Sequence, residues 1–239
     1  MPVESADPAN SQQKLWTFGR ILQLVVFVAI WIGGMFVAAG TIWWSRGWIF
    51  TIGILSLYAG ATAWVMLKNP ALLPARAKWH FGEMRRFDRV FIGLLFPLYL
   101  AQPIVAGLDA VRYHWTSMPS WTIFAGLILL ASGMGTITWA MEVNQFAEPV
   151  VRIQKERNQT AVTTGPYRYV RHPMYVGAIV MFPATGLALG SWWAVAIGGV
   201  LSLLFVWRTA MEDRVLLREL PGYQEFAAAT RYRLVPGVW

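Results

Sequence analysis

Residues 164–177 read TGPYRYVRHPMYVG, and the rest of the chain is organised around this stretch. Basic side chains stand among tyrosines within it, namely Arg168, Arg171 and His172 with Tyr167, Tyr169 and Tyr175. Pro173 favours an extended backbone at the preceding residue and removes one backbone donor. Because the sequence becomes apolar directly afterwards, we predict a shaped polar loop that leads into a membrane helix and forms a ligand site at the bilayer surface.

Composition places the chain among membrane proteins, since 56% of its residues are hydrophobic and only 13% are charged. The net charge is +8, but the basic residues occur in short loops between apolar segments. They therefore indicate orientation signals and contacts with membrane lipids, and not a nucleic-acid partner. The absence of cysteine excludes a disulfide, a thiolate metal site and a cysteine nucleophile.

Six apolar segments are expected to form helices. They lie at about 18–42, 47–67, 90–110, 121–141, 174–190 and 192–207. The first four are long enough to cross a bilayer core of about 30 Å, whereas the last two have about 16 residues each. These two predict a tight hairpin that crosses a thinned or protein-lined region, or that re-enters without crossing. The fold class is all-α: a polytopic transmembrane bundle of five to six helices without a Rossmann domain.

Loop charges predict the topology. The segment 68–89 carries six basic residues, residues 152–171 carry five and residues 208–233 carry five, whereas the alternate loops hold only Arg46 and Arg112. The positive-inside rule therefore places both termini and the basic loops in the cytoplasm. Residues 1–17 lack a basic n-region, and the apolar run after them is too long for a signal peptide, so we expect a retained first span.

Several common kinds of site are excluded. The chain has no G-x-G-x-x-G after a strand, no Walker loop and no G-x-S-x-G elbow. His80, His114 and His172 are far apart and fall in loops predicted on both sides of the membrane, so no shared metal is expected. Long polar stretches occur only on the predicted cytoplasmic side, where we therefore expect any chemistry.

Two of these polar segments are separated only by the final hairpin. Arg208 and Glu212 are spaced i, i+4 at the end of the last apolar segment and share one helical face. Since a hairpin returns the chain to the membrane face where it began, residues 152–177 and the segment from 208 onward are expected to meet. Taken alone, Arg208 and Glu212 are also compatible with a juxtamembrane salt bridge.

The combined pattern is similar to that of a known family. GPYRYVRHPMYVG at 165–177, RTAMED at 208–213 and LPGYQEF at 220–226 resemble the isoprenylcysteine carboxyl methyltransferases, which are related to the phospholipid N-methyltransferases. The likeness covers roughly residues 142–239, while residues 1–141 match only as generic spans. We therefore expect a four-span membrane region at 1–141. The catalytic region at 142–239 would contain the cofactor loop, the helical hairpin and a C-terminal amphipathic segment that forms a lid or anchor.

This resemblance implies a membrane methyltransferase that uses S-adenosylmethionine. The implied cofactor-binding residues are Thr160, Ala161 and Val162 through their backbone, together with Tyr167, His172, Pro173, Met174, Tyr175 and Glu212. Arg208 matches a position that contacts the methyl acceptor, and it is the implied catalytic residue. The chemistry of these side chains agrees, because aromatic and polar groups suit an amphiphilic cofactor with an adenine, a ribose and a zwitterionic tail.

The nature of the acceptor decides whether a base is needed. A carboxylate is already ionised at neutral pH, so its methylation needs alignment and exclusion of water, and Arg208 suits its orientation. A phospholipid amine must lose a proton, for which Glu212, Asp213 or His172 are candidates. We expect a lipophilic acceptor, preferably the carboxylate of an isoprenylcysteine-like molecule. The alternatives are N-methylation of a phospholipid amine and a non-catalytic lipid-binding protein of the same fold.

Overall fold

The computed structural model describes residues 18–78 and 80–239. These residues form helices and loops without a strand, and five helices are long and apolar enough to cross a membrane. The five are α2 (Phe18–Ala39), α3 (Ser45–Lys68), α5 (Arg86–Gly107) with its π-helical extension η2 (Leu108–Tyr113), α6 (Thr122–Val143) and α8 (Trp192–Glu219). A shorter apolar helix, α7, covers Pro173–Leu189. The prediction of a polytopic helical membrane bundle is confirmed.

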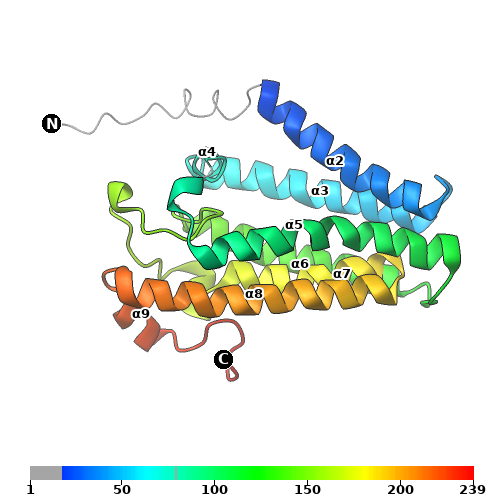
Figure 1. Cartoon of the computed structure of the whole chain (residues 1–239). Coiled ribbons are helices and arrows are strands. Elements are labelled where there is room, and N and C mark those ends of the chain that lie inside the picture. Colours follow the sequence, from blue (N-terminus) through cyan, green and yellow to red (C-terminus); the bar gives the residue numbers. More distant parts are fainter. Residues whose placement is uncertain (1–17, 79) are drawn as a thin grey trace.

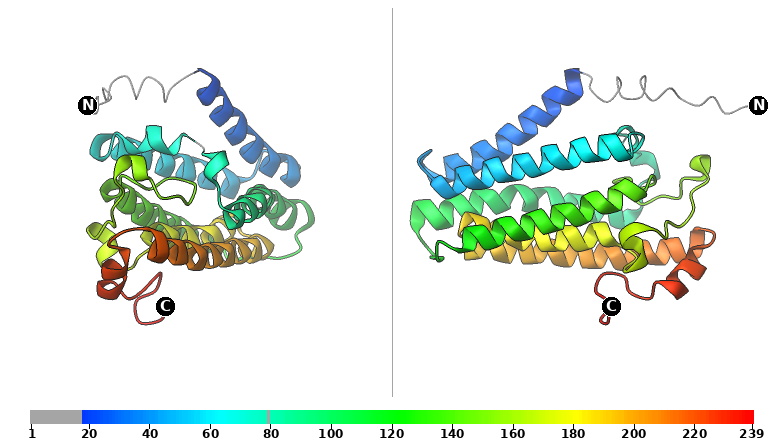
Figure 2. Two further views of the ribbon diagram at one scale, coloured as in Figure 1. Left: turned by 60° about the vertical axis from the view of Figure 1, so that its left-hand side comes forward. Right: turned by 180° about the vertical axis from the view of Figure 1, so that it is seen from behind.

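The helices run side by side, with α2 leaning away from the others at one edge (Figure 1). Long loops gather at one end of the bundle, together with α4 (Leu72–Arg76) and α9 (Tyr223–Ala229), as Figure 2 also shows. The same end holds three short 3-10 turns, η1 (Phe81–Glu83), η3 (Lys155–Arg157) and η4 (Gly165–Arg168). The opposite end has only short connections. The strongly basic loops therefore share one end of the described chain.

Glycines let α7 pack closely between its neighbours α6 and α8. A Cβ atom on Gly177 would lie 2.4 Å from the carbonyl oxygen of Gly133 in α6, and one on Gly198 in α8 would lie 2.5 Å from that of Phe182. Pro183 leaves the carbonyl of Ile179 without its helical donor. The Ser202 hydroxyl of α8 donates to this carbonyl at 2.8 Å. The final hairpin is therefore a tightly joined pair.

The last helix is longer than the apolar pattern predicts. We expected a segment of about 16 residues ending near residue 207, but α8 has 28 residues and ends at Glu219. The hydropathy signal stops at the first charges, whereas residues 208–219 are mostly good helix formers and the chain has no helix breaker before Pro221. Only α7 is short, so the prediction of two short helices was wrong for α8.

The C-terminal helix is shorter than the amphipathic segment that we expected. The α9 helix covers Tyr223–Ala229 only. Tyr223 and Phe226 are buried in a cluster that includes Tyr167 and Leu220, so they face the polar loop and the body of the protein.

Candidate active site

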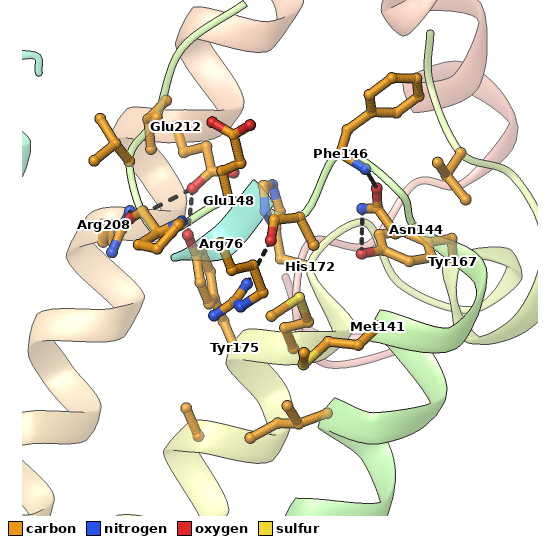
Figure 3. Close-up of a pocket in the computed structure, with 18 of the residues that line it drawn as sticks. Arg76, Met141, Asn144, Phe146, Glu148, Tyr167, His172, Tyr175, Arg208 and Glu212 are labelled. Carbon is orange, nitrogen blue, oxygen red and sulfur yellow. Dashed lines mark hydrogen bonds and ion pairs between the residues drawn. The ribbon is translucent and has the colours of Figure 1, made fainter. Parts of the chain in front are cut away.

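A cavity of about 520 Å³ lies at the end of the bundle where the long loops gather, since residues of these loops and of α4 line it. Ligand pockets typically have volumes of about 300–1,000 Å³. Nine of the ten residues singled out from the sequence line it: Thr160, Ala161, Val162, Tyr167, His172, Met174, Tyr175, Arg208 and Glu212. The tenth, Pro173, is buried in the first turn of α7 and does not line the cavity. The fold thus brings both predicted segments to one place (Figure 3).

The loop 164–177 is shaped by its own residues. Gly165 has a φ of +59°, which side-chain-bearing residues rarely adopt, and η4 begins there. His172 precedes the first turn of α7, where Pro173 occupies a position that needs no backbone donor. The backbone N–H groups of Arg171 and His172 donate to the carbonyls of Tyr232 and Arg233 at 2.9 and 3.0 Å. The C-terminal segment therefore holds the loop in place.

Asp213 joins these two segments. Its carboxylate is fully buried and accepts two hydrogen bonds from Arg171, at 2.8 and 2.9 Å. Arg233 Nε donates to it at 2.7 Å and the Tyr223 hydroxyl at 3.0 Å. A buried carboxylate needs such partners, and a bidentate guanidinium is the strongest of them. Asp213 does not line the cavity, so its position suits a structural role better than that of a base.

His172 lies between this cluster and the cavity. Its Nε2 is 3.3 Å from the Asp213 carboxylate, and its ring stacks on Tyr175 with centroids 5.6 Å apart and planes 7° apart. The imidazole is only 6% exposed. It therefore offers a fixed flat surface at the cavity wall.

The two site residues predicted on α8, Arg208 and Glu212, are connected to each other and to α7. The Tyr175 hydroxyl donates a short hydrogen bond to the Glu212 carboxylate. Arg208 Nε is 3.9 Å from the same carboxylate, as the i, i+4 spacing predicted, and Figure 3 shows the three side chains together. Arg208 Nη2 donates to the Pro149 carbonyl at 2.6 Å. Within the described residues, the buried Nε of Arg208 has no hydrogen-bond partner.

Asp88 is a further member of this group, and the sequence did not indicate it. It lies in the first turn of α5, is fully buried, and accepts the Val151 N–H at 2.6 Å. Its other oxygen is 3.1 Å from Arg208 Nη2. Asp88 therefore holds Arg208 from behind the cavity wall. The sequence contains one signal that could have pointed to Asp88. It is an acidic residue at the start of an apolar span, in a segment that carries six basic residues.

Arg76 also lines the cavity, although sequence analysis used it only as a topological charge. It ends the short helix α4, and its Nη1 donates to the Ala147 carbonyl at 2.5 Å. Burial lowers the pKa of this guanidinium from its ordinary value, and the positive charge of Arg208 contributes in the same direction.

Tyr167 and Asn144 form another part of the wall. Asn144 Nδ2 donates to the Tyr167 hydroxyl at 2.7 Å, while its Oδ1 accepts the Phe146 N–H at 2.9 Å (Figure 3). Burial raises the pKa of the Tyr167 phenol, so it stays neutral at physiological pH. The wall here offers an aromatic face with a fixed polar tip.

The backbone of residues 160–162 borders the cavity without regular secondary structure. In the described part of the chain, the N–H and C=O groups of these three residues make no hydrogen bond to other protein groups. Peptide groups of this kind are free to bind a polar ligand. No cluster of three or more His, Asp or Glu residues suited to a metal is found among residues 18–78 and 80–239.

Comparison with known proteins adds to this geometry. Residues 121–220 match the family model described as phospholipid methyltransferase, and this family includes isoprenylcysteine carboxyl methyltransferase-like membrane enzymes. The chain is also 37% identical over 84 residues to the cobalt-zinc-cadmium resistance protein CzcN of Cupriavidus metallidurans. That alignment covers 33% of this chain and 37% of CzcN. The family match confirms the resemblance stated from the sequence.

Proposed function

We propose that this protein transfers a methyl group from S-adenosylmethionine to a lipophilic acceptor, preferably the carboxylate of an isoprenylcysteine-like molecule. The observation that carries the proposal is the shared cavity, in which the loop 164–177 and the polar end of α8 meet at the end of a membrane bundle. Such a position gives access both to a water-soluble cofactor and to a substrate that is dissolved in the bilayer.

The residues present fit this cofactor. The unpaired peptide groups of 160–162 suit its polar edges, and the flat faces of Tyr167 and His172 suit packing against its adenine. Glu212, held by Tyr175, offers an acceptor for its ribose hydroxyls or its amino group. Met174 adds apolar surface, and Pro173 shapes the loop from behind. When bound, the cofactor supplies an electrophilic methyl group on a sulfonium sulfur.

Arg208 is the proposed acceptor-binding residue. Its Nε donor remains without a hydrogen-bond partner in the described chain, and Asp88 and the Pro149 carbonyl fix the orientation of its guanidinium. A carboxylate that accepts a hydrogen bond from this donor would be oriented for attack, and it needs no base because it is already ionised. The role of the protein is then alignment and exclusion of water.

N-methylation of a phospholipid amine is the second candidate, because the matching family is described by phospholipid methylation. This reaction needs a group that accepts a proton. Glu212 and His172 line the cavity and remain candidates, whereas Asp213 is engaged by Arg171 and Arg233.

We further propose that the cavity faces the cytoplasm. The described loops at this end carry most of the basic residues, which the positive-inside rule assigns to that side. We also propose that residues 142–239 form the catalytic region on a membrane region of residues 1–141.

Calorimetric titration of detergent-purified protein with S-adenosylhomocysteine tests the cofactor site. We expect binding by the wild-type protein, and weaker binding by Glu212→Ala. The exposed residue Glu219 on the same helix provides a matched control, so Glu219→Ala should bind normally. Transfer of a radiolabelled methyl group to a prenylcysteine analogue or to phosphatidylethanolamine then identifies the acceptor. A wild-type protein that does not bind the cofactor product would leave only the non-catalytic lipid-binding alternative.

A further inference from the structure

Arg76 differs from the other arginines that line the cavity. The other three each have a carboxylate partner: Arg152 pairs with Glu148 at 2.8 Å, Arg171 with Asp213 at 2.8 Å and Arg208 with Asp88 at 3.1 Å. Arg76 has no carboxylate oxygen within 4.0 Å among residues 18–78 and 80–239. A guanidinium remains charged in proteins, so the cavity contains a cation that the described chain does not neutralise.

Glu148 is a carboxylate that acts on Arg76 electrostatically, but it is engaged elsewhere. Both of its oxygens accept hydrogen bonds from Arg152, at 2.8 and 3.2 Å, and Arg157 lies 3.7 Å away. The charge of Glu148 is therefore shared among several cations. Burial disfavours an unpaired charge, and an anion beside Arg76 would relieve this penalty.

The position of Arg76 is fixed by its helix. Leu72 of α4 is fully buried and packs in one cluster with Val65 of α3 and Ala147. Asn69, which directly follows α3 and comes three residues before the start of α4, donates to the Met141 carbonyl at 2.8 Å. Among residues 18–78 and 80–239, Arg76 donates one side-chain hydrogen bond, to the Ala147 carbonyl, which uses one of its five guanidinium N–H groups. The remaining donors are available to a ligand in the cavity.

The apolar surroundings indicate which part of a ligand would reach Arg76. A second cavity of about 230 Å³ extends between the helices, with apolar and aromatic walls. Its lining includes five residues of the first cavity, namely Tyr58, Leu95, Phe96, Ile137 and Ala178. Tyr58 and Leu95 belong to α3 and α5, the two helices that flank α4 in the chain. A hydrocarbon tail in this space would leave its polar head near Arg76 and Arg208.

From this arrangement we propose that Arg76 binds an oxyanion of the methyl acceptor and, with Arg208, selects acceptors that carry a negative charge. The oxyanion is either the carboxylate that becomes methylated or the phosphodiester next to a phospholipid amine. Since it names a group of the acceptor, this proposal rests on the function proposed above. It places a substrate-selecting residue in α4, outside residues 121–220 that match the family model.

The test compares the binding of lipids with and without an oxyanion by detergent-purified protein loaded with S-adenosylhomocysteine. One pair of probes is N-acetyl-S-farnesylcysteine and its carboxamide; the other is phosphatidylethanolamine and diacylglycerol. We expect the wild-type protein to bind the oxyanion-bearing member of one pair about 10- to 100-fold more tightly, which is the change in affinity that one hydrogen bond to a charged group gives. Arg76→Gln should lose most of this preference, and Arg76→Lys should retain part of it because it keeps the charge without the planar fork.

Lys78→Gln is the matched control, because it removes an exposed positive charge from the same short segment. It should leave the preference unchanged. The proposal is overturned if the wild-type protein shows no preference in either pair or if Arg76→Gln keeps it. It is also overturned if Arg76→Gln loses affinity for S-adenosylhomocysteine by the same factor, since the anion would then belong to the cofactor. If the wild-type protein does not bind S-adenosylhomocysteine, the proposed function is refuted. The role of Arg76 is then tested by comparing the same lipids with protein that carries no S-adenosylhomocysteine.

Discussion

Replacing Asp213 with alanine would leave the Arg171 guanidinium buried without its carboxylate. In the structure the side chains of Arg171 and Asp213 are 7% and 0% exposed, and two hydrogen bonds join them. The variant would also remove the acceptor for Arg233 and for the Tyr223 hydroxyl. His172 Nε2 also lies 3.3 Å from this carboxylate, so four groups from the polar loop and the C-terminal segment would lose their common partner.

Breaking a buried ion pair by removing one partner costs about 3–5 kcal/mol. For a chain of this size the melting temperature changes by about 2–4 °C per kcal/mol, so we expect Asp213→Ala to lower it by about 6–20 °C. Asp213→Asn keeps an oxygen acceptor but loses the charge, so its effect should be smaller. The assay is thermal unfolding of the purified protein in detergent.

Glu219→Ala serves as the control for loss of a carboxylate from the same helix. Glu219 pairs with Arg85, but both side chains are well exposed, at 40% and 37%. Exposed pairs contribute only about 0–1 kcal/mol, so the melting temperature should hardly change. If Asp213→Ala melts no lower than Glu219→Ala, Asp213 does not hold the loop and the C-terminal segment together.

Three other variants test separate features. Gly177→Ala places a methyl group 2.4 Å from the Gly133 carbonyl oxygen and should lower the free energy of unfolding by about 1–3 kcal/mol. Gly135→Ala meets open space and should not destabilise the protein in the same thermal unfolding assay. Equal effects of the two variants would contradict the close packing of α6 and α7. Asp88→Asn removes the charge that positions Arg208, so we expect a higher KM for the acceptor and an unchanged affinity for S-adenosylhomocysteine. A variant that loses only affinity for S-adenosylhomocysteine would argue against a role of Asp88 in acceptor binding. Burial and the Asp213 carboxylate raise the pKa of Tyr223, so the unfolded chain releases the phenol proton at a lower pH than the folded protein does. The stability of the protein should therefore fall as the pH rises above about 10, and it should fall less in Tyr223→Phe. Thermal unfolding measured between about pH 8 and 11 tests this expectation.

The membrane bundle and much of the candidate site could be predicted from local patterns. Long apolar runs specify helices by themselves, because the bilayer leaves few other solutions for the backbone. The loop 164–177 was also visible, since Gly165, Pro166 and Pro173 restrict the backbone locally. The spacing of Arg208 and Glu212 correctly placed them on one helical face.

Asp88 and Arg76 could not be assigned in this way, because their surroundings come from distant parts of the chain. Asp88 meets Arg208 across 120 positions, and Arg76 meets Ala147 across 71. In the sequence both residues belong to a basic loop whose charges already explain the topology. The end of α8 was misplaced for a different reason, since hydropathy does not record helix propensity beyond the first charge.

The walls of the cavity differ in how they are built, and this affects how new acceptors could be obtained by directed evolution. On one side, α6, α7 and α8 are joined by glycine contacts and by the bond from Ser202 to Ile179, so substitutions there disturb the bundle. On another side lies α4, a helix of five residues in the loop between α3 and α5. A library randomised at residues 73–78 and keeping Leu72 would change the polar and steric features around the acceptor while leaving the cofactor loop intact. Selection for altered acceptor range should therefore recover variants in this segment more often than in α7 or α8.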